Sequence, residues 1–102
     1  WEIAKAFDGA APISEFVGIS EYSNIQNINF QLLKNGELVQ KGNTIDMIFS
    51  VDKLIAYVSQ YVTLKIGDLL FTGTPEGVGP VQINDHLEGF IEDQKMLDFF
   101  VK

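Results

Sequence analysis

The clearest alternation of hydrophobic and polar positions lies between residues 28 and 41. Ile28, Phe30 and Leu32 are separated by polar residues, a period of two that is typical of a strand with one face against a core. The Asn-Gly pair at 35–36 follows directly, and this pair favours a tight hairpin turn. Residues 37–41 then return as a second strand. The pattern predicts a β-hairpin.

A helical period begins after residue 50. Apolar residues recur at spacings of three, four, seven and eleven: Val51, Leu54, Ile55, Val58 and Val62. Ser50 has the side chain of an N-cap, and Asp52 suits the first turn of a helix. These features predict one main helix over 51–61. Thr44 is expected to cap a single turn just before it.

Further strands are predicted in the C-terminal part. The phrases Ile-Gly-Asp at 66–68 and Ile-Asn-Asp at 83–85 each place a residue that tolerates positive φ before an aspartate and an apolar run. We expect two turns that begin strands at 69–72 and 86–91. A final strand is expected over 95–102. The sequence therefore predicts a single mainly β (α+β) unit with one main helix.

Composition narrows the class of protein. The chain has 102 residues, enough for one domain with its own hydrophobic core, and a net charge of −7 from 14 acidic and 7 basic residues. This charge argues against nucleic acid as a partner. Cysteine is absent, which excludes disulfides, thiolate nucleophiles and thiolate zinc sites. No apolar run approaches the length of about 18 residues that a membrane span requires.

The first residues include a lysine among apolar neighbours. Lys5 lies between Trp1 and Phe7, in a stretch unusually apolar for a chain terminus. This suggests that the sequence is the C-terminal portion of a longer protein. The Lys5 ammonium either reaches water or pairs with an anion, and the pattern alone favours water.

The acidic residues show no persuasive spacing for metal ligands. Glu88 and Glu92 are expected to share one solvated face of a strand. His86, the one histidine, is expected to have a surface or structural role.

The glycine-rich segment TGTPEGVGP at 72–80 has the residues of an anion-binding turn. Its glycines match neither GxxxxGK[ST] nor GxGxxG, and no helix is expected after it, which argues against a nucleotide phosphate loop. It is either a turn that offers N–H groups and a threonine hydroxyl to a carboxylate, or a plain connector. Composition alone favours the connector.

Several phrases carry a family resemblance. KAFDGAAPIS at 5–14, the run from NGELVQ to GVGPV at 35–81, and the Ile-Asn-Asp phrase resemble the C-terminal half of the fumarylacetoacetate hydrolase family. The resemblance covers nearly all of residues 1–102 and is strongest to the acylpyruvase and oxaloacetate decarboxylase–tautomerase branch. It implies a mixed β-sheet roll and a homodimer, in the cytoplasm or, in a eukaryote, the mitochondrion.

The resemblance also implies roles for three residues. Lys5 matches the family lysine beside the metal and the substrate oxygens, and Thr74 matches the threonine that binds the substrate carboxylate. Gly73 would permit close backbone approach. The family's Mg²⁺ or Mn²⁺ ligands, a Glu-x-Glu pair and an aspartate, lie upstream of the phrase that begins at Trp1, as does its catalytic His–Glu pair. None of them is expected in this chain.

The implied chemistry is metal-dependent hydrolysis, decarboxylation or tautomerisation of 2-oxo acids such as acylpyruvates, fumarylpyruvate or oxaloacetate. One alternative is an isomerase of 2-hydroxyhepta-2,4-diene-1,7-dioate in aromatic catabolism. Another is a noncatalytic fragment that acts only as a dimerisation or partner domain. For catalysis, the chain is expected to require the missing N-terminal part.

Overall fold

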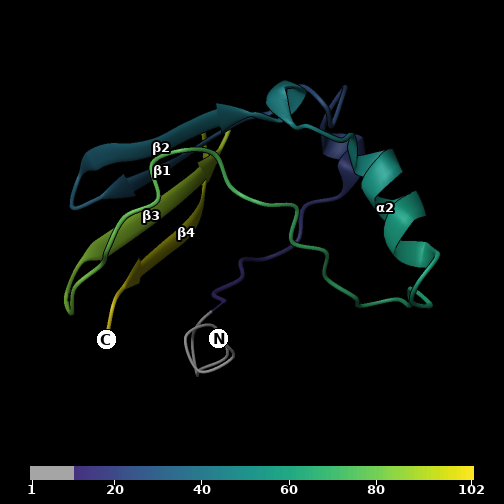
Figure 1. Cartoon of the computed structure of the whole chain (residues 1–102). Helices are drawn as coiled ribbons and strands as arrows, with labels where there is room; N and C mark the ends of the chain where they lie inside the picture. Colours follow the sequence, from purple (N-terminus) through teal and green to yellow (C-terminus); the bar gives the residue numbers. More distant parts are fainter. Residues whose placement is uncertain (1–10) are drawn as a thin grey trace.

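The computed structural model describes residues 11–102 as a four-stranded sheet with one α-helix beside it (Figure 1). The elements in chain order are the 3₁₀ turn η1 (Ile19–Glu21), β1 (Asn29–Lys34), β2 (Glu37–Asn43), the 3₁₀ turn η2 (Thr44–Asp46), α2 (Val51–Ser59), β3 (His86–Ile91) and β4 (Gln94–Phe100). The predicted class, mainly β with one main helix, is confirmed.

The strands lie in the order β2-β1-β3-β4, so two hairpins are joined side by side. All three pairings are antiparallel. Within residues 11–102 the sheet is therefore antiparallel, whereas the resemblance implied a mixed sheet. An antiparallel arrangement needs only short turns, and each hairpin here has one.

The predicted Asn-Gly hairpin is confirmed. Asn35 and Gly36 have φ of 53° and 82°, the two positive values that a two-residue turn of the favoured hand requires. Asn35 also fixes the start of β3, because its N–H donates to the His86 carbonyl at 2.8 Å and its Oδ1 accepts from the His86 N–H at 2.8 Å. Its side-chain amide donates to Asp85 at 2.9 Å. One turn thus aligns both hairpins.

Helix α2 forms where the apolar period predicts it. Ser50 Oγ accepts from the Lys53 N–H at 3.2 Å, as an N-cap does. The predicted cap of the preceding turn was wrong: the Asn43 side chain caps η2 by accepting from Ile45. Thr44 Oγ1 instead bridges two distant backbone groups, accepting from Ile28 N at 2.9 Å and donating to Ile25 O at 2.7 Å.

The strand predicted over 69–72 does not form. The turn before it does, because Asp68 Oδ2 accepts from Lys65 N–H at 2.8 Å and Gly67 has φ of 93°. The matching turn at Asp85 leads into β3. Strands require a hydrogen-bonded neighbour. Among residues 11–102 no strand pairs with 69–72, and the chain continues as an irregular loop to β3.

The expected self-contained hydrophobic core is absent from the described part of the chain. No hydrophobic side chain there is fully buried, and Ile48 and Phe71 are 92% and 71% exposed. The chain exposes 8509 Å², whereas a folded monomer of 11.4 kDa exposes about 5,800 Å². Helix α2 stands beside the sheet and covers neither face (Figure 1). No helix in the described range is long and apolar enough to cross a bilayer.

Candidate functional site

The TGTPEGVGP loop at 72–80 contacts one face of the sheet. Thr74 and Pro75 share a hollow with Phe30 and Leu32 of β1, and with apolar side chains of β4. The loop therefore lies over the apolar face of the sheet rather than extending from its edge.

Hydrogen bonds fasten this loop to β1 and β2. Gln40 Nε2 donates to Thr74 Oγ1 at 2.8 Å and to the Pro75 carbonyl at 3.0 Å. Lys34 Nζ donates to the Pro80 carbonyl at 3.2 Å. Both ends of the loop are thus attached to the sheet, one by Gln40 of β2 and the other by Lys34 of β1.

Two glycines give the loop backbone conformations that other residues rarely adopt. Gly73 has φ of 102° with open space where a side chain would point, so its backbone is accessible from the hollow beside it. Gly77 has φ of 105°, and a Cβ there would overlap the Val39 carbonyl oxygen and lie 3.0 Å from Gln40 Cγ. The first glycine gives access to the backbone, and the second permits close packing on β2.

Thr74 also lines a second, larger hollow of about 620 Å³ between the loop and the segment after β2. This volume suits a small-molecule ligand. The residues that line it include Thr72, Thr74, Asp46 and Glu76, and the backbone of β2 at 41–43 runs along one side. Threonine hydroxyls can bind an anion, and the hollow also has two acidic residues in its lining.

The three predicted site residues have different outcomes. Thr74 and Gly73 both line the larger hollow, and their roles in substrate binding stay predictions. Lys5 lies outside the described residues, so its position relative to Thr74 stays a prediction.

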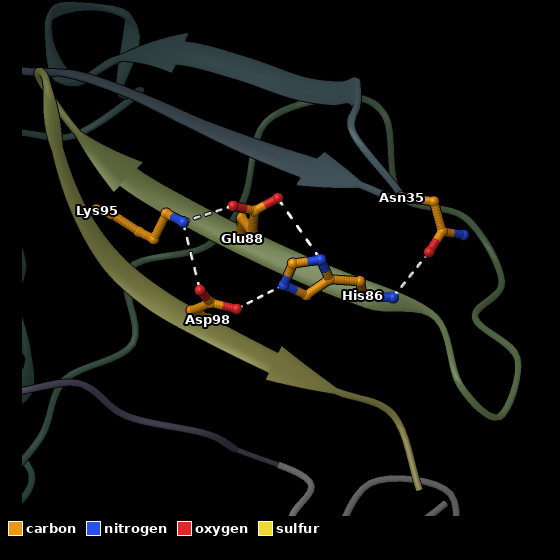
Figure 2. Close-up of polar contacts among 5 residues, drawn as sticks. All are labelled: Asn35, His86, Glu88, Lys95 and Asp98. Carbon is orange, nitrogen blue, oxygen red and sulfur yellow. Dashed lines mark hydrogen bonds and ion pairs between the residues drawn. The ribbon is translucent and has the colours of Figure 1, made fainter.

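A polar cluster that the sequence did not predict lies on β3 and β4 (Figure 2). His86 Nε2 is 2.5 Å from Asp98 Oδ1, and its Nδ1 is 3.7 Å from Glu88 Oε1. Lys95 Nζ is 2.7 Å from Glu88 Oε2 and 3.3 Å from Asp98 Oδ2. The two carboxylates therefore sit between an imidazole and an ammonium.

The expected solvated face of Glu88 and Glu92 was wrong. The Glu88 side chain is only 15% exposed. Glu92 lies in the β3–β4 turn with φ of 53° and accepts from the Asn29 N–H at 3.0 Å. A strand that ends at Ile91 cannot keep both glutamates on one face.

The cluster forms because of strand register. His86 and Glu88 are two residues apart and so share a face, a signal present in the sequence. Asp98 lies opposite Glu88 in the pairing, and a bulge between Gly89 and Phe90 shifts Lys95 into reach. The bulge could not be read from the sequence, so the cluster could not be predicted.

The cluster shifts the titration of its members. The hydrogen bond with His86, and next that with Lys95, lowers the pKa of Asp98 below its usual range. Hydrogen bonds to Glu88 and Asp98 raise the pKa of Lys95. In the turn beside it, the Asn35 amide and the Gln82 N–H lower the pKa of Asp85. All these groups are at the surface, so the shifts reflect local pairing.

The cluster does not fit the implied Mg²⁺ or Mn²⁺ site. His86, Glu88 and Asp98 offer ligand atoms within 4.8 Å of one another, the one such group among the described residues. Lys95 already balances the carboxylates, and Mg²⁺ prefers an all-oxygen shell. Side-chain alternation also places the cluster on the face opposite the one that Thr74 covers, since Glu88 neighbours Gly89 in β3. The cluster is an ion-pair network between two strands.

Comparisons with known proteins identify the relatives of this chain. The family model described as "Fumarylacetoacetate (FAA) hydrolase C-terminal" matches residues 1–99. Oxaloacetate tautomerase YcgM of Escherichia coli (strain K12) is 50% identical over 88 residues, which are 85% of this chain and 40% of that protein. The mitochondrial oxaloacetate tautomerase FAHD1 of Mus musculus is 43% identical over 102 residues, which are 100% of this chain and 46% of that protein. The chain thus spans less than half the length of these relatives.

Solved structures show the same fold. A fumarylacetoacetate hydrolase family protein from Yersinia pestis CO92 superposes with a TM-score of 0.93 at 43% identity, covering 100% of this chain and 48% of that one. Maleylpyruvate hydrolase from Sphingobium sp. SYK-6, in complex with manganese(II) ion and pyruvate, has a TM-score of 0.74 at 35% identity over 84% of this chain and 32% of that one. The expected fold type is confirmed.

Proposed function

Because this chain belongs to the fumarylacetoacetate hydrolase family, we propose that the protein containing it converts small 2-oxo acids and that Thr74 binds their carboxylate. Among hydrolysis, decarboxylation and tautomerisation we favour tautomerisation of oxaloacetate, since relatives at 50% and 43% identity are oxaloacetate tautomerases. The observation that carries the proposal is the position of Thr74, which lies at the hollow with its hydroxyl fixed by Gln40.

Each residue has a defined part in this chemistry. The Thr74 hydroxyl donates a hydrogen bond to the substrate carboxylate. Gly73, which has no side chain, lets the substrate approach the loop backbone. Tautomerisation moves a proton from the methylene carbon of the keto acid to its keto oxygen, through an enolate. The Lys5 ammonium would lie beside that oxygen and stabilise its negative charge.

The divalent metal is proposed to be held by residues outside this chain. The related maleylpyruvate hydrolase was crystallised with manganese(II), which supports a divalent cation in the family. The described group of His86, Glu88 and Asp98 does not fit such a site. Replacing His86 by Gln in the full-length protein should therefore leave the dependence of activity on added Mg²⁺ or Mn²⁺ unchanged. A marked loss of metal activation would place the metal at the cluster.

The role of Thr74 is tested by Thr74→Val in the full-length protein, with oxaloacetate as substrate. A hydrogen bond to a charged group contributes about 1.5–3 kcal/mol, so we expect kcat/KM to fall by roughly 10- to 100-fold. Thr63→Val, the same change at an exposed position outside both hollows, is the control. Equal kinetics for the two variants would refute the role of Thr74.

Lys5 and the reaction type are tested in the same assay. Lys5→Ala should lower kcat strongly while the protein remains folded, because an ammonium beside an enolate acts mainly in the transition state. Near-normal turnover would remove Lys5 from the site. A panel of oxaloacetate, acylpyruvates, fumarylpyruvate and 2-hydroxyhepta-2,4-diene-1,7-dioate distinguishes tautomerase, hydrolase and isomerase. No activity on any of them would favour the noncatalytic alternative.

Assembly and location follow from the same relationship. We propose a homodimer in which the upstream part of the protein and a second copy cover the apolar surface that residues 11–102 leave exposed. Light scattering on the full-length protein tests this. The location is proposed to be cytoplasmic, or mitochondrial in a eukaryote as in the mouse relative.

A further inference from the structure

We propose that Gln40 is a positioning residue that orients the Thr74 hydroxyl so that its one proton points to the substrate carboxylate. The inference rests on the proposed function, in which Thr74 binds a 2-oxo acid. Gln40 lies on β2, 34 positions before Thr74 in sequence, whereas Thr74 lies in the loop.

The orientation of the Gln40 amide follows from its two partners. The amide nitrogen lies 2.8 Å from Thr74 Oγ1 and 3.0 Å from the Pro75 carbonyl oxygen. A carbonyl oxygen can only accept, so the group that faces Pro75 must be the NH₂ of Gln40. If the amide were reversed, the Gln40 oxygen would face the Pro75 carbonyl oxygen, and neither atom can donate. Gln40 is therefore a double donor to the loop.

The donor role of Gln40 determines where the Thr74 hydroxyl proton can point. A threonine hydroxyl has one proton and two lone pairs, and its proton rotates to suit its partners. Because a lone pair of Oγ1 is taken by the Gln40 amide, the proton is left for a different acceptor. Hydrogen bonds in series also polarise one another, so the Thr74 hydroxyl becomes a better donor to an anion.

The position of Gln40 is itself fixed by the sheet. Gln40 pairs with Leu32 across the β1–β2 ladder, and both share the face that the loop covers. The loop is pressed onto the same point, because a Cβ at Gly77 would overlap the Val39 carbonyl oxygen. Strand and loop hold Gln40 and Thr74 in register before a ligand arrives, which is the condition for preorganised binding.

The test uses the full-length protein and compares variants of Gln40. Gln40→Met keeps the length of the side chain and removes both donors. Gln40→Glu also keeps its shape, but its carboxylate accepts the Thr74 proton. We expect KM for oxaloacetate to rise about five- to tenfold in Gln40→Met, with a smaller change in kcat, and to rise further in Gln40→Glu. Gln94→Met, on the edge strand β4, is the matched control.

A double-mutant cycle separates positioning from general support of the fold. If Gln40 acts through Thr74, adding Gln40→Met to Thr74→Val should change KM less than twofold. Additive effects of the two changes, or equal KM for Gln40→Met and Gln94→Met, would overturn the proposal. Because Thr74→Val is measured alone, its failure to weaken binding identifies an error in the proposed function. An effect of Thr74→Val without one of Gln40→Met refutes the role of Gln40 alone.

Discussion

Replacing Gly77 by Ala gives the sharpest test of how the TGTPEGVGP loop is held. Two separate penalties meet at this residue. Its φ of 105° is strained for any residue with a Cβ, and a Cβ there would overlap the Val39 carbonyl oxygen and lie 3.0 Å from Gln40 Cγ. The Val39 oxygen is a backbone atom of β2, so it cannot yield as the end of a flexible side chain could. We expect Gly77→Ala to lift the loop off β2.

The magnitude can be estimated from the two effects. Holding a residue with a side chain in a sparsely populated φ region costs about 1–3 kcal/mol. Forcing an extra carbon against packed atoms costs about 1–3 kcal/mol more. The sum, about 2–6 kcal/mol, is a large part of the stability of a typical domain. Part of the energy can be avoided if the loop detaches, at the expense of the Gln40–Thr74 hydrogen bond.

Two glycines of the same chain serve as matched controls. Gly67 has φ of 93° with nothing within 4 Å of a Cβ, so Gly67→Ala reports the cost of conformation alone. Gly79 has neither the positive φ nor a neighbour within 4 Å, so Gly79→Ala should be close to neutral. The assay is urea unfolding of the full-length proteins, together with KM for oxaloacetate.

The expected order of destabilisation is Gly77→Ala, then Gly67→Ala, then Gly79→Ala. Gly77→Ala should also raise KM, since Thr74 and Gln40 separate when the loop moves. If Gly77→Ala is no less stable than Gly67→Ala and binds oxaloacetate normally, then the loop is not pressed on β2. Thr74 would then not be positioned by the packing of the loop on the sheet.

Two further predictions concern α2 and the β3–β4 network. Ser50→Ala removes the N-cap of α2 and should destabilise the protein by about 1 kcal/mol, seen as faster amide exchange in the helix, whereas Ser59→Ala at its other end should change exchange little. The folded pKa of Asp98 lies below 3.8, so its stabilisation is present above that pH and is lost as the pH falls through the folded value. Asp98→Asn should therefore lower the urea midpoint near neutral pH and flatten its decline in acid, while Asp93→Asn, in the same hairpin, should keep the wild-type profile. An acid decline as steep in Asp98→Asn as in the wild type would refute the pairing.

Local sequence was enough for the elements whose contacts are short-range. The hairpin at 35–36 depends on two residues that adopt positive φ, and helix α2 depends on a cap and an apolar period. The turns at 66–68 and 83–85 depend on aspartates whose side chains accept from the backbone N–H three residues earlier. The glycine-rich loop was already separated from phosphate loops by its spacing.

Contacts between distant residues were beyond local sequence. The run at 69–72 has the composition of a strand but pairs with no strand among residues 11–102, so propensity alone misassigned it. The same limit applies to the network of His86 and Asp98, which requires the register of β3 and β4 and a bulge that leaves no local signature.

The sequence by itself determined the family and the residues expected to bind substrate, because those phrases are specific and their turns are local. The tertiary structure alone decided that Thr74 of the loop is held by Gln40 of β2, since only folding brings positions 40 and 74 together. It also showed that residues 11–102 bury no hydrophobic side chain completely. A hydrophobic pattern predicts which face of an element is apolar. Whether that face is buried depends on which other surface packs against it.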